Sequence, residues 1–136
     1  IFKTGVANQM VSLLLSPSAL AVEASKDKIV QLYVYIGDWL DVSIESNGYA
    51  TCSGYIDIYV DYDSTLTLTL QRSSNGSRWS DIKSWSKSFT TTGTNFMEKG
   101  YYVESGYYYR VLTTAEVKRG SAVLETATCY SSVESY

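Results

Sequence analysis

Hydrophobic and polar side chains alternate along most of the chain from residue 28 onward. Between Val30 and Ile36 every second residue is aliphatic, and the same period of two runs through residues 40–45, 50–60 and 65–70. Because successive side chains of a β-strand point to opposite faces, each of these segments is expected to bury one face. No segment sustains the 3.6-residue period of a helix, so the pattern predicts strands throughout.

Asn-Gly pairs separate several of the predicted strands. Asn47-Gly48 and Asn75-Gly76 are typical of hairpin turns, because both residue types tolerate positive φ angles. The second pair, with Ser77, also matches an N-glycosylation acceptor, but a turn accounts for every residue in it. Arg119-Gly120 predicts a further turn before the last strand.

The strand predicted from about Trp79 to Phe89 is irregular. Its Ile82 is out of phase with Trp79 and Trp85, which indicates either a β-bulge or a strand that contributes to both surfaces. With this segment included, the chain holds eight or nine short predicted strands. We therefore expect an all-β fold, a single antiparallel β-sandwich that is immunoglobulin-like in architecture.

The first 27 residues follow a different pattern. An apolar run at 11–15, followed by small residues at 19–21, is weakly similar to the end of a secretory signal, but Ser16-Pro17-Ser18 interrupts it. We expect residues 1–27 to form an N-terminal arm or a first strand, and residues 28–136 to form the β-sandwich domain. An arm of this kind can complete an open sheet edge of a neighbouring subunit.

Composition narrows the class of partners. The 136 residues carry a net charge of −3, which provides no basic field to attract nucleic acid or an anionic membrane surface. The apolar runs are much shorter than the ~20 residues of a membrane-spanning helix. We expect no nucleic-acid partner and no membrane insertion.

The chain contains no histidine, the side chain most used as a general base and metal ligand. Ser-His-Asp, Cys-His and histidine-zinc sites are thereby excluded, and no phosphate-binding glycine motif occurs. A pair of carboxylates, as in glycosidases, remains the one enzymatic alternative, but no spacing selects two of the fourteen acids. We expect no enzyme activity, no catalytic residues and no cofactor.

Three acids, Asp57, Asp61 and Asp63, follow one another near the end of a predicted strand. Their oxygens are of the kind that calcium binds, but the spacing differs from an EF-hand loop. A charged turn that protects a strand edge from pairing explains the same residues, so no metal site is expected.

Two cysteines bear on the redox environment. Cys52 lies on the apolar phase of its strand and Cys129 lies on the last strand. An even number of cysteines in a secreted domain predicts a disulfide, which would contribute up to ~4 kcal/mol by restricting the unfolded chain. The alternative is two buried free thiols that pack as small hydrophobic groups.

Several segments resemble a group of small secreted β-sandwich proteins of Gram-positive gut bacteria. The segments are Leu70–Trp79, Ile82–Ser86, Lys99–Val103 and Gly106–Val111, with Gly48–Cys52 upstream. The resemblance covers roughly residues 40–130. It implies secretion or a cell-surface location and a β-sandwich, and it implies no particular activity.

Residues 104–110 also resemble the strand of immunoglobulin-type domains that carries a tyrosine corner. This resemblance places Tyr108 at the corner, with its hydroxyl bonded to upstream backbone. Arg110 occupies the position at which such domains have a cysteine. The resemblance therefore concerns architecture.

Thirteen tyrosines are the strongest indication of function. If the aliphatic phase is buried, five tyrosines on neighbouring strands point outward. The five are Tyr33, Tyr35, Tyr49, Tyr55 and Tyr59. Tyrosine is frequent on binding surfaces, although it is also a good strand former whose ring packs on cross-strand neighbours.

This tyrosine face predicts a secreted, non-catalytic interaction protein. Its partner would be another protein, either a host surface protein such as an immunoglobulin or further copies of the chain. Two alternatives stay open. The first is a carbohydrate-binding module, since aromatic faces stack on sugars, and the second is a structural subunit of an extracellular assembly completed by the N-terminal arm.

Overall fold

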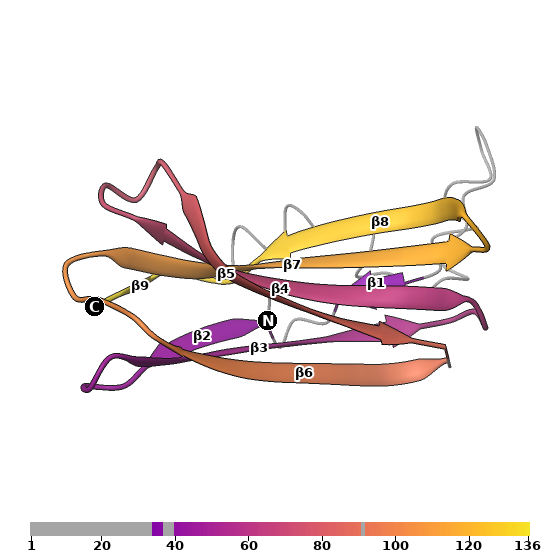
Figure 1. The fold of residues 1–136 in the computed structure, drawn as a ribbon, viewed down its shortest axis with the longest axis horizontal. Coiled ribbons are helices and arrows are strands. Elements are labelled where there is room, and N and C mark those ends of the chain that lie inside the picture. The colour runs from indigo at the N-terminus through magenta and orange to yellow at the C-terminus, as the bar shows by residue number, and fades with distance from the viewer. Residues whose placement is uncertain (1–33, 37–39, 91) are drawn as a thin grey trace.

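A computed structural model shows two antiparallel β-sheets packed face to face (Figure 1). The structure describes residues 34–36, 40–90 and 92–136. Within these ranges no helix is long and apolar enough to cross a membrane. The predicted all-β sandwich is confirmed, whereas the predicted N-terminal arm or first strand at 1–27 lies outside the described residues.

The first sheet is built around β3. Its strands are β1 (Val34–Ile36), β2 (Asp41–Ile44), β3 (Tyr49–Ile58) and β6 (Gly93–Tyr102). β6 pairs with β3 along the whole length of β3, so β1 and β2 share the opposite edge of that strand. β6 is therefore an edge strand of ten residues.

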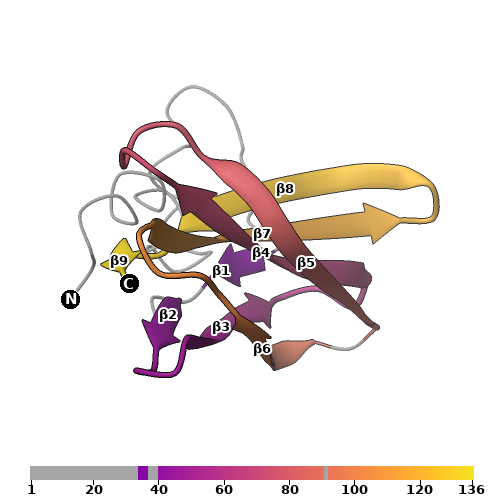
Figure 2. The same ribbon diagram turned by 60° about the vertical axis from the view of Figure 1, so that its left-hand side comes forward.

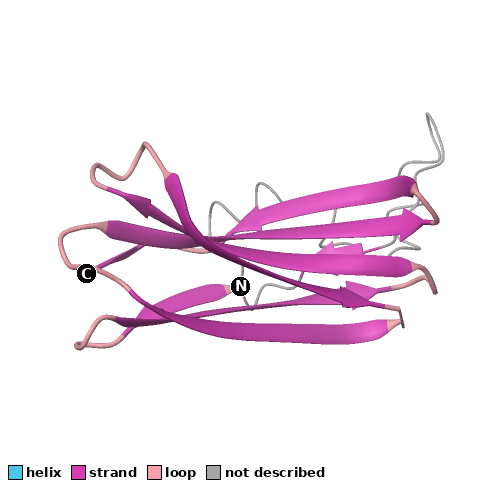
Figure 3. Ribbon diagram, in the orientation of Figure 1, coloured by secondary structure: helices cyan, strands magenta, loops and turns pink. Residues whose placement is uncertain are grey.

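The second sheet has the order β5, β4, β7, β8, and the short β9 pairs with β7. Its strands are β4 (Asp63–Ser73), β5 (Ser80–Phe89), β7 (Tyr108–Arg119), β8 (Ala122–Tyr130) and β9 (Glu134–Ser135). The chain passes between the sheets from β3 to β4, from β5 to β6 and from β6 to β7. Figures 2 and 3 show the two layers of strands, with β5 crossing obliquely at one side of the sandwich.

The core lies between the inner faces of the two sheets, as the alternation predicts. β3 contributes Ala50, Cys52, Ile56 and Ile58, and β4 contributes Leu66, Leu68 and Leu70, all buried. β7 adds Val111, Ala115 and Val117 from the next strand of the second sheet. Burial of these aliphatic side chains is the main favourable contribution to folding.

The turns form where glycine was predicted to allow them. Gly48, Gly76 and Gly120 have φ angles of 87°, 78° and 64°, and no other residue type among the described residues has a positive φ. In the first hairpin the Gly48 amide donates to the Glu45 carbonyl at 2.9 Å. Within the Asn47-Gly48 pair, the glycine alone has a left-handed backbone conformation. Asn75 instead caps its turn, accepting at Oδ1 from the amides of Ser77 and Arg78, each at 2.9 Å.

The predicted bulge is confirmed. Leu70 pairs with Lys83 and Gln71 pairs with Asp81, so Ile82 has no partner in the β4–β5 ladder. The extra residue lets Ile82 and Trp85 both pack against the core despite their spacing of three.

The predicted disulfide is not present, because Cys52 and Cys129 are both free thiols. Cys52 lies in the middle of β3 and Cys129 lies in β8, the strand beyond β7 in the opposite sheet. Each sulfur is fully buried within the core. The apolar phase correctly placed Cys52 inside, and the alternative of two buried free thiols is the one observed. Alternation within a strand does not specify which inward positions of the two sheets meet.

The structure contains a tyrosine corner, but Tyr109 forms it and not the predicted Tyr108. Tyr109, which is fully buried, donates its hydroxyl hydrogen to the carbonyl oxygen of Glu104. Tyr108 points to the other face and is 41% exposed. The prediction of Tyr108 was wrong by one residue, and in a strand one residue exchanges the two faces.

Candidate binding site

The outer face of the first sheet carries aromatic residues from two adjacent strands. In the β3–β6 ladder Tyr49 lies opposite Tyr102, and Tyr55 lies opposite Phe96. Directly opposed residues of an antiparallel pair share a face, so each pair forms an aromatic contact surface. Tyr49 and Tyr55 are six residues apart on one strand, or about 20 Å, which places the two pairs at opposite ends of the sheet.

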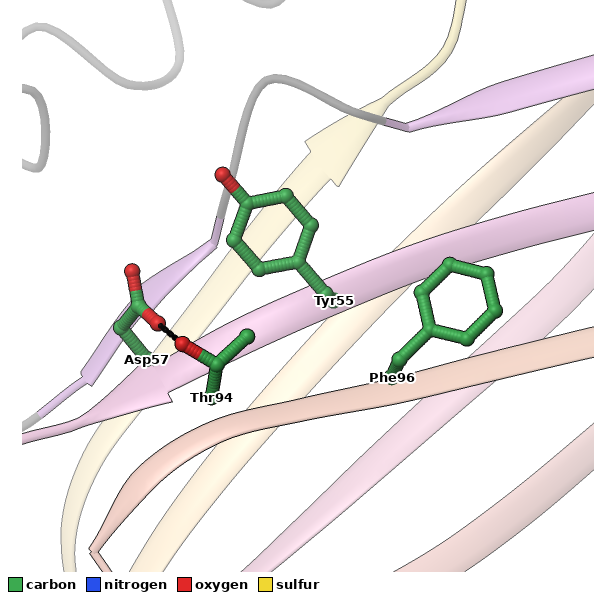
Figure 4. Close-up of a pocket in the computed structure, with 4 residues that line it drawn as sticks. All are labelled: Tyr55, Asp57, Thr94 and Phe96. Atoms are coloured by element: carbon green, nitrogen blue, oxygen red, sulfur yellow. Dashed lines mark hydrogen bonds between the residues drawn. The ribbon is translucent and has the colours of Figure 1, made fainter.

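A pocket of about 500 Å³ lies at the Tyr55 end of this face. The described residues that line it are Tyr55, Asp57, Thr94 and Phe96 (Figure 4). These residues supply two aromatic rings, the hydroxyl groups of Tyr55 and Thr94, and one carboxylate. The Phe96 side chain is 45% exposed, a large value for an apolar ring.

The polar pair of the pocket is held together by a hydrogen bond. The Thr94 hydroxyl donates to Oδ1 of Asp57, as the dashed line in Figure 4 marks. This contact fixes the orientation of the carboxylate on the face of the sheet. The second carboxylate oxygen, Oδ2, adds acceptor capacity for a ligand group that donates hydrogen bonds.

Tyr59 follows β3 directly and belongs to the same end of the sheet. Its side chain is 42% exposed. Burial of the remaining part of the side chain raises the pKa of its hydroxyl, and the nearby Asp57 and Tyr55 raise that pKa further. The phenol therefore stays neutral at physiological pH and keeps its hydrogen as a donor.

The aromatic pair at the other end is more tightly packed. The Tyr49 and Tyr102 rings meet edge to face with centroids 5.0 Å apart. The Tyr49 ring lies across Gly100, where an added Cβ would come within 1.7 Å of the tyrosine oxygen. Tyr49 therefore covers a glycine of the neighbouring strand, and Tyr102, at 67% exposed, is the more accessible ring.

The five predicted binding tyrosines thus fall into separate groups. Tyr55 lines the pocket and Tyr59 lies near Tyr55 and Asp57, whereas Tyr49 lies at the far end with Tyr102. Tyr35 of β1 pairs with Asp57 in the backbone ladder, and Tyr33 lies outside the described residues.

Two surface aromatics from β6, Phe96 and Tyr102, were absent from the predicted binding residues. Both lie on the outer face of β6, opposite tyrosines of β3. The alternation carried a usable signal for Phe96, because Met97 is the buried residue and its neighbour must face outward. The pairing of β6 with β3 is a tertiary feature that joins residues about forty positions apart.

The three weighed acids do not converge. Asp57 lies on the outer face of the first sheet. Asp61 precedes β4 and Asp63 begins it, and both are exposed. Across the described ranges no group of three or more His, Cys, Asp or Glu side chains is placed to hold a metal ion. The chemistry present at the pocket is aromatic stacking and hydrogen bonding around one carboxylate.

No protein-family model matches the chain, and a search of curated proteins finds no match. Among solved structures, the chain is similar to CsgH of R. palustris, with 17% identity over 71% of this chain and 90% of that one, at a TM-score of 0.40.

It is also similar to a β-glucuronidase of Bacteroides uniformis, with 19% identity over 72% of this chain and a TM-score of 0.41. A third similar structure is a GH3 β-glucosidase of Bifidobacterium adolescentis, with 12% identity over 81% of this chain and a TM-score of 0.38. The chain corresponds to 12% of the first enzyme and 20% of the second, so the likeness concerns a small part of each. These similarities concern the fold alone.

Proposed function

We propose that this chain is a secreted, non-catalytic binding module that recognises another protein through the outer face of its first sheet. The observation that carries the proposal is the pocket between Tyr55 and Phe96, with its single carboxylate at Asp57. The partner is either a host surface protein such as an immunoglobulin or a second copy of the chain.

The composition of this face supports a protein partner. Protein interfaces are enriched in tyrosine and phenylalanine, because a rigid ring supplies contact area at a low cost in conformational entropy. Phe96, which lines the pocket, exposes a large part of its ring, and so does Tyr59 at the same end of the sheet. A concavity beside exposed rings is suited to burying one anchoring side chain of a partner. The Asp57 carboxylate favours an anchor that donates hydrogen bonds or carries positive charge.

A carbohydrate ligand is the second candidate, and one observation favours it. The pocket combines two aromatic rings with the hydroxyl of Thr94 and the carboxylate of Asp57 in one concavity. A sugar ring offers an apolar face for stacking and hydroxyls for both polar groups. An assembly subunit completed by the N-terminal arm remains a third proposal.

Binding assays with a double variant test the proposal. We expect Tyr55→Ser combined with Phe96→Ser to weaken binding about 30-fold or more, because two anchors near the centre of an interface carry ~2 kcal/mol or more between them. The measurement is biolayer interferometry against immobilised immunoglobulin G, with light scattering after size exclusion for self-association. Tyr108→Ser is the matched control, since Tyr108 is 41% exposed but lies on the second sheet.

Three outcomes decide between the candidates. Loss of binding in the double variant, with Tyr108→Ser unchanged and the thermal midpoint preserved, supports a protein partner. Binding on a glycan array that depends on the same two residues, without protein binding, supports the carbohydrate alternative. Equal binding by the double variant and the parent chain contradicts the proposed site.

A further inference from the structure

The outer face of the second sheet holds an arginine clamped between two aromatic rings. The Arg110 guanidinium carbon lies 4.2 Å from the centroid of the Trp79 ring and 4.0 Å from that of Tyr130. The three residues come from different elements: Trp79 precedes β5, Arg110 lies in β7 and Tyr130 ends β8. Stacking on both faces confines the guanidinium to one plane.

A hydrogen-bond chain fixes the rotation of the guanidinium within that plane. Nε of Arg110 donates to Oε1 of Gln71 at 2.8 Å, and Nε2 of Gln71 donates to Oδ1 of Asp81 at 2.8 Å. Asp81 is thus engaged by the glutamine amide. No acceptor among the described residues receives a hydrogen bond from the two terminal nitrogens of Arg110, Nη1 and Nη2. They form a pre-oriented pair of donors on a half-buried side chain.

The charge of Arg110 also lacks a partner among the described residues. No carboxylate within the described ranges forms an ion pair with it. Burial lowers the pKa of the guanidinium, and the neighbouring Tyr130 opposes this effect. An arginine stays protonated in proteins, so a partly dehydrated positive charge faces outward with no ion-pair partner in the part of the chain that the structure describes.

The face around this arginine is covered with hydroxyl groups. Across β4 and β5 the side chains of Thr65 and Ser88, Thr67 and Ser86, and Thr69 and Ser84 form hydrogen-bonded pairs of 3.3, 2.8 and 2.9 Å. The middle row continues onto β7 and β8 through Thr114, which pairs with Thr67 and with Thr128. The row of Thr69 continues through Leu112 to Tyr130, and the row of Thr65 continues through Glu116. Serine is depleted in protein interfaces, whereas hydroxyl groups can both donate to and accept from the hydroxyls of a sugar.

We infer that Arg110 is a carboxylate-binding site for an acidic polysaccharide, the Nη1 and Nη2 pair taking the carboxylate of a uronic acid residue while the adjacent Ser and Thr rows contact its hydroxyls. The planar fork of an arginine matches the two oxygens of a carboxylate. The chain has a net charge of −3, so general electrostatic attraction does not favour a polyanion. This site is on the other sheet from the pocket, and it does not depend on the proposed protein-binding function.

Affinity electrophoresis and calorimetry with polygalacturonate test the inference. We expect the parent chain to bind polygalacturonate and to ignore the same polymer after methyl esterification, which removes the carboxylate charge. Arg110→Lys keeps the positive charge but loses the fork, so it should weaken binding about ten-fold or more. Trp79→Leu should weaken it less, because it keeps the arginine and removes one stacking ring.

Arg119→Lys is the matched control, since Arg119 also lies over a ring, with 5.8 Å to the centroid of Tyr62, at the opposite end of β7. Its binding should equal that of the parent chain. Thermal midpoints establish that each variant is folded. If Arg110→Lys unfolds, binding of polygalacturonate by Trp79→Leu tests the inference in its place, and binding equal to that of the parent chain would contradict it. Equal binding by the esterified polymer, or by Arg110→Lys when folded, would overturn the inference. Equal binding of poly-L-glutamate would overturn the polysaccharide assignment.

Discussion

Two buried hydroxyl groups, those of Ser64 and Thr113, find no hydrogen-bond partner among the described residues. Thr113 is fully buried on the inner face of β7, where the methyl side of the residue packs in the core. Its Oγ1 lies only 3.4 Å from the point that a Cβ on Gly54 would occupy, so it faces the first sheet directly. An unpaired buried hydroxyl costs free energy because it has lost water without replacement.

Thr113→Val should therefore stabilise the protein. Valine has nearly the same shape and removes the unpaired hydroxyl, so the free energy of unfolding should rise by about 1 kcal/mol. Urea denaturation followed by tryptophan fluorescence measures this change. Thr114→Val, on the outer face of the same strand, should change it by less than about 0.5 kcal/mol. Destabilisation by Thr113→Val would mean that the hydroxyl has a partner in the folded protein.

At the scale of elements, the connection between β6 and β7 is fastened at several points. The Tyr109 hydroxyl bonds to the Glu104 carbonyl, and the Gly106 amide donates to the carbonyl of Tyr136 at 2.6 Å. The Val103 amide donates to the Gly48 carbonyl at 2.8 Å, which ties this loop to the β2–β3 hairpin. The tyrosine corner therefore belongs to a network that joins both sheets at one end of the sandwich.

Tyr109→Phe should destabilise the protein by about 1 kcal/mol, because it removes one hydrogen bond and leaves the Glu104 carbonyl without that donor. The midpoint of chemical denaturation reports the loss. Tyr108→Phe is the comparison, since Tyr108 is largely exposed, and its cost should stay below about 0.5 kcal/mol. A larger effect from Tyr108 than from Tyr109 would refute the assignment of the corner.

The strands themselves were predictable, because the period of two is a local property. The alternation at 50–60 and 65–70 and the irregular phase of Ile82 translate directly into β3, β4 and the bulge of β5. The binding pocket was predictable only in part. Tyr55 was selected from its phase, but Phe96 joins it through the β3–β6 pairing, which no local pattern specifies.

At the scale of the whole molecule, the sandwich presents two outer faces of different chemistry. The first sheet exposes Phe96, Tyr102 and neighbouring aromatics, and the second exposes rows of Ser and Thr beside Arg110. A continuous core separates the faces, and no disulfide joins the sheets within the described residues. Packing of the core therefore holds the two sheets together. The free energy of unfolding also depends on whether the buried thiols are protonated.

Because Cys52 and Cys129 are free thiols, the free energy of unfolding depends on pH in the alkaline range. Burial raises the pKa of Cys52 from 9.0 to about 12 and that of Cys129 from 9.0 to about 11. A group whose folded pKa is raised contributes full stability below its unfolded pKa and loses that contribution as pH rises through the folded value. We expect the free energy of unfolding to fall between pH 9 and about 12, where unfolded thiols ionise first.

Denaturation at pH 7 and pH 10 measures this dependence, and the Cys52→Ala, Cys129→Ala double variant should show a smaller fall. At pH 7 a reductant should leave the thermal midpoint of the parent chain unchanged. Iodoacetamide should label both cysteines only after unfolding. A midpoint that drops with reductant would show that a disulfide forms in the protein.

The sequence by itself determined that this chain forms strands, which of their faces are apolar and where glycine permits a turn, since each depends on neighbours a few residues away. It also placed Cys52 in the core and Tyr55 on the surface. Only the tertiary structure decided that the cysteines lie in opposite sheets as free thiols and that Tyr109 forms the corner. It also brought Trp79, Arg110 and Tyr130 together, because strand order and register join residues that are far apart in the chain.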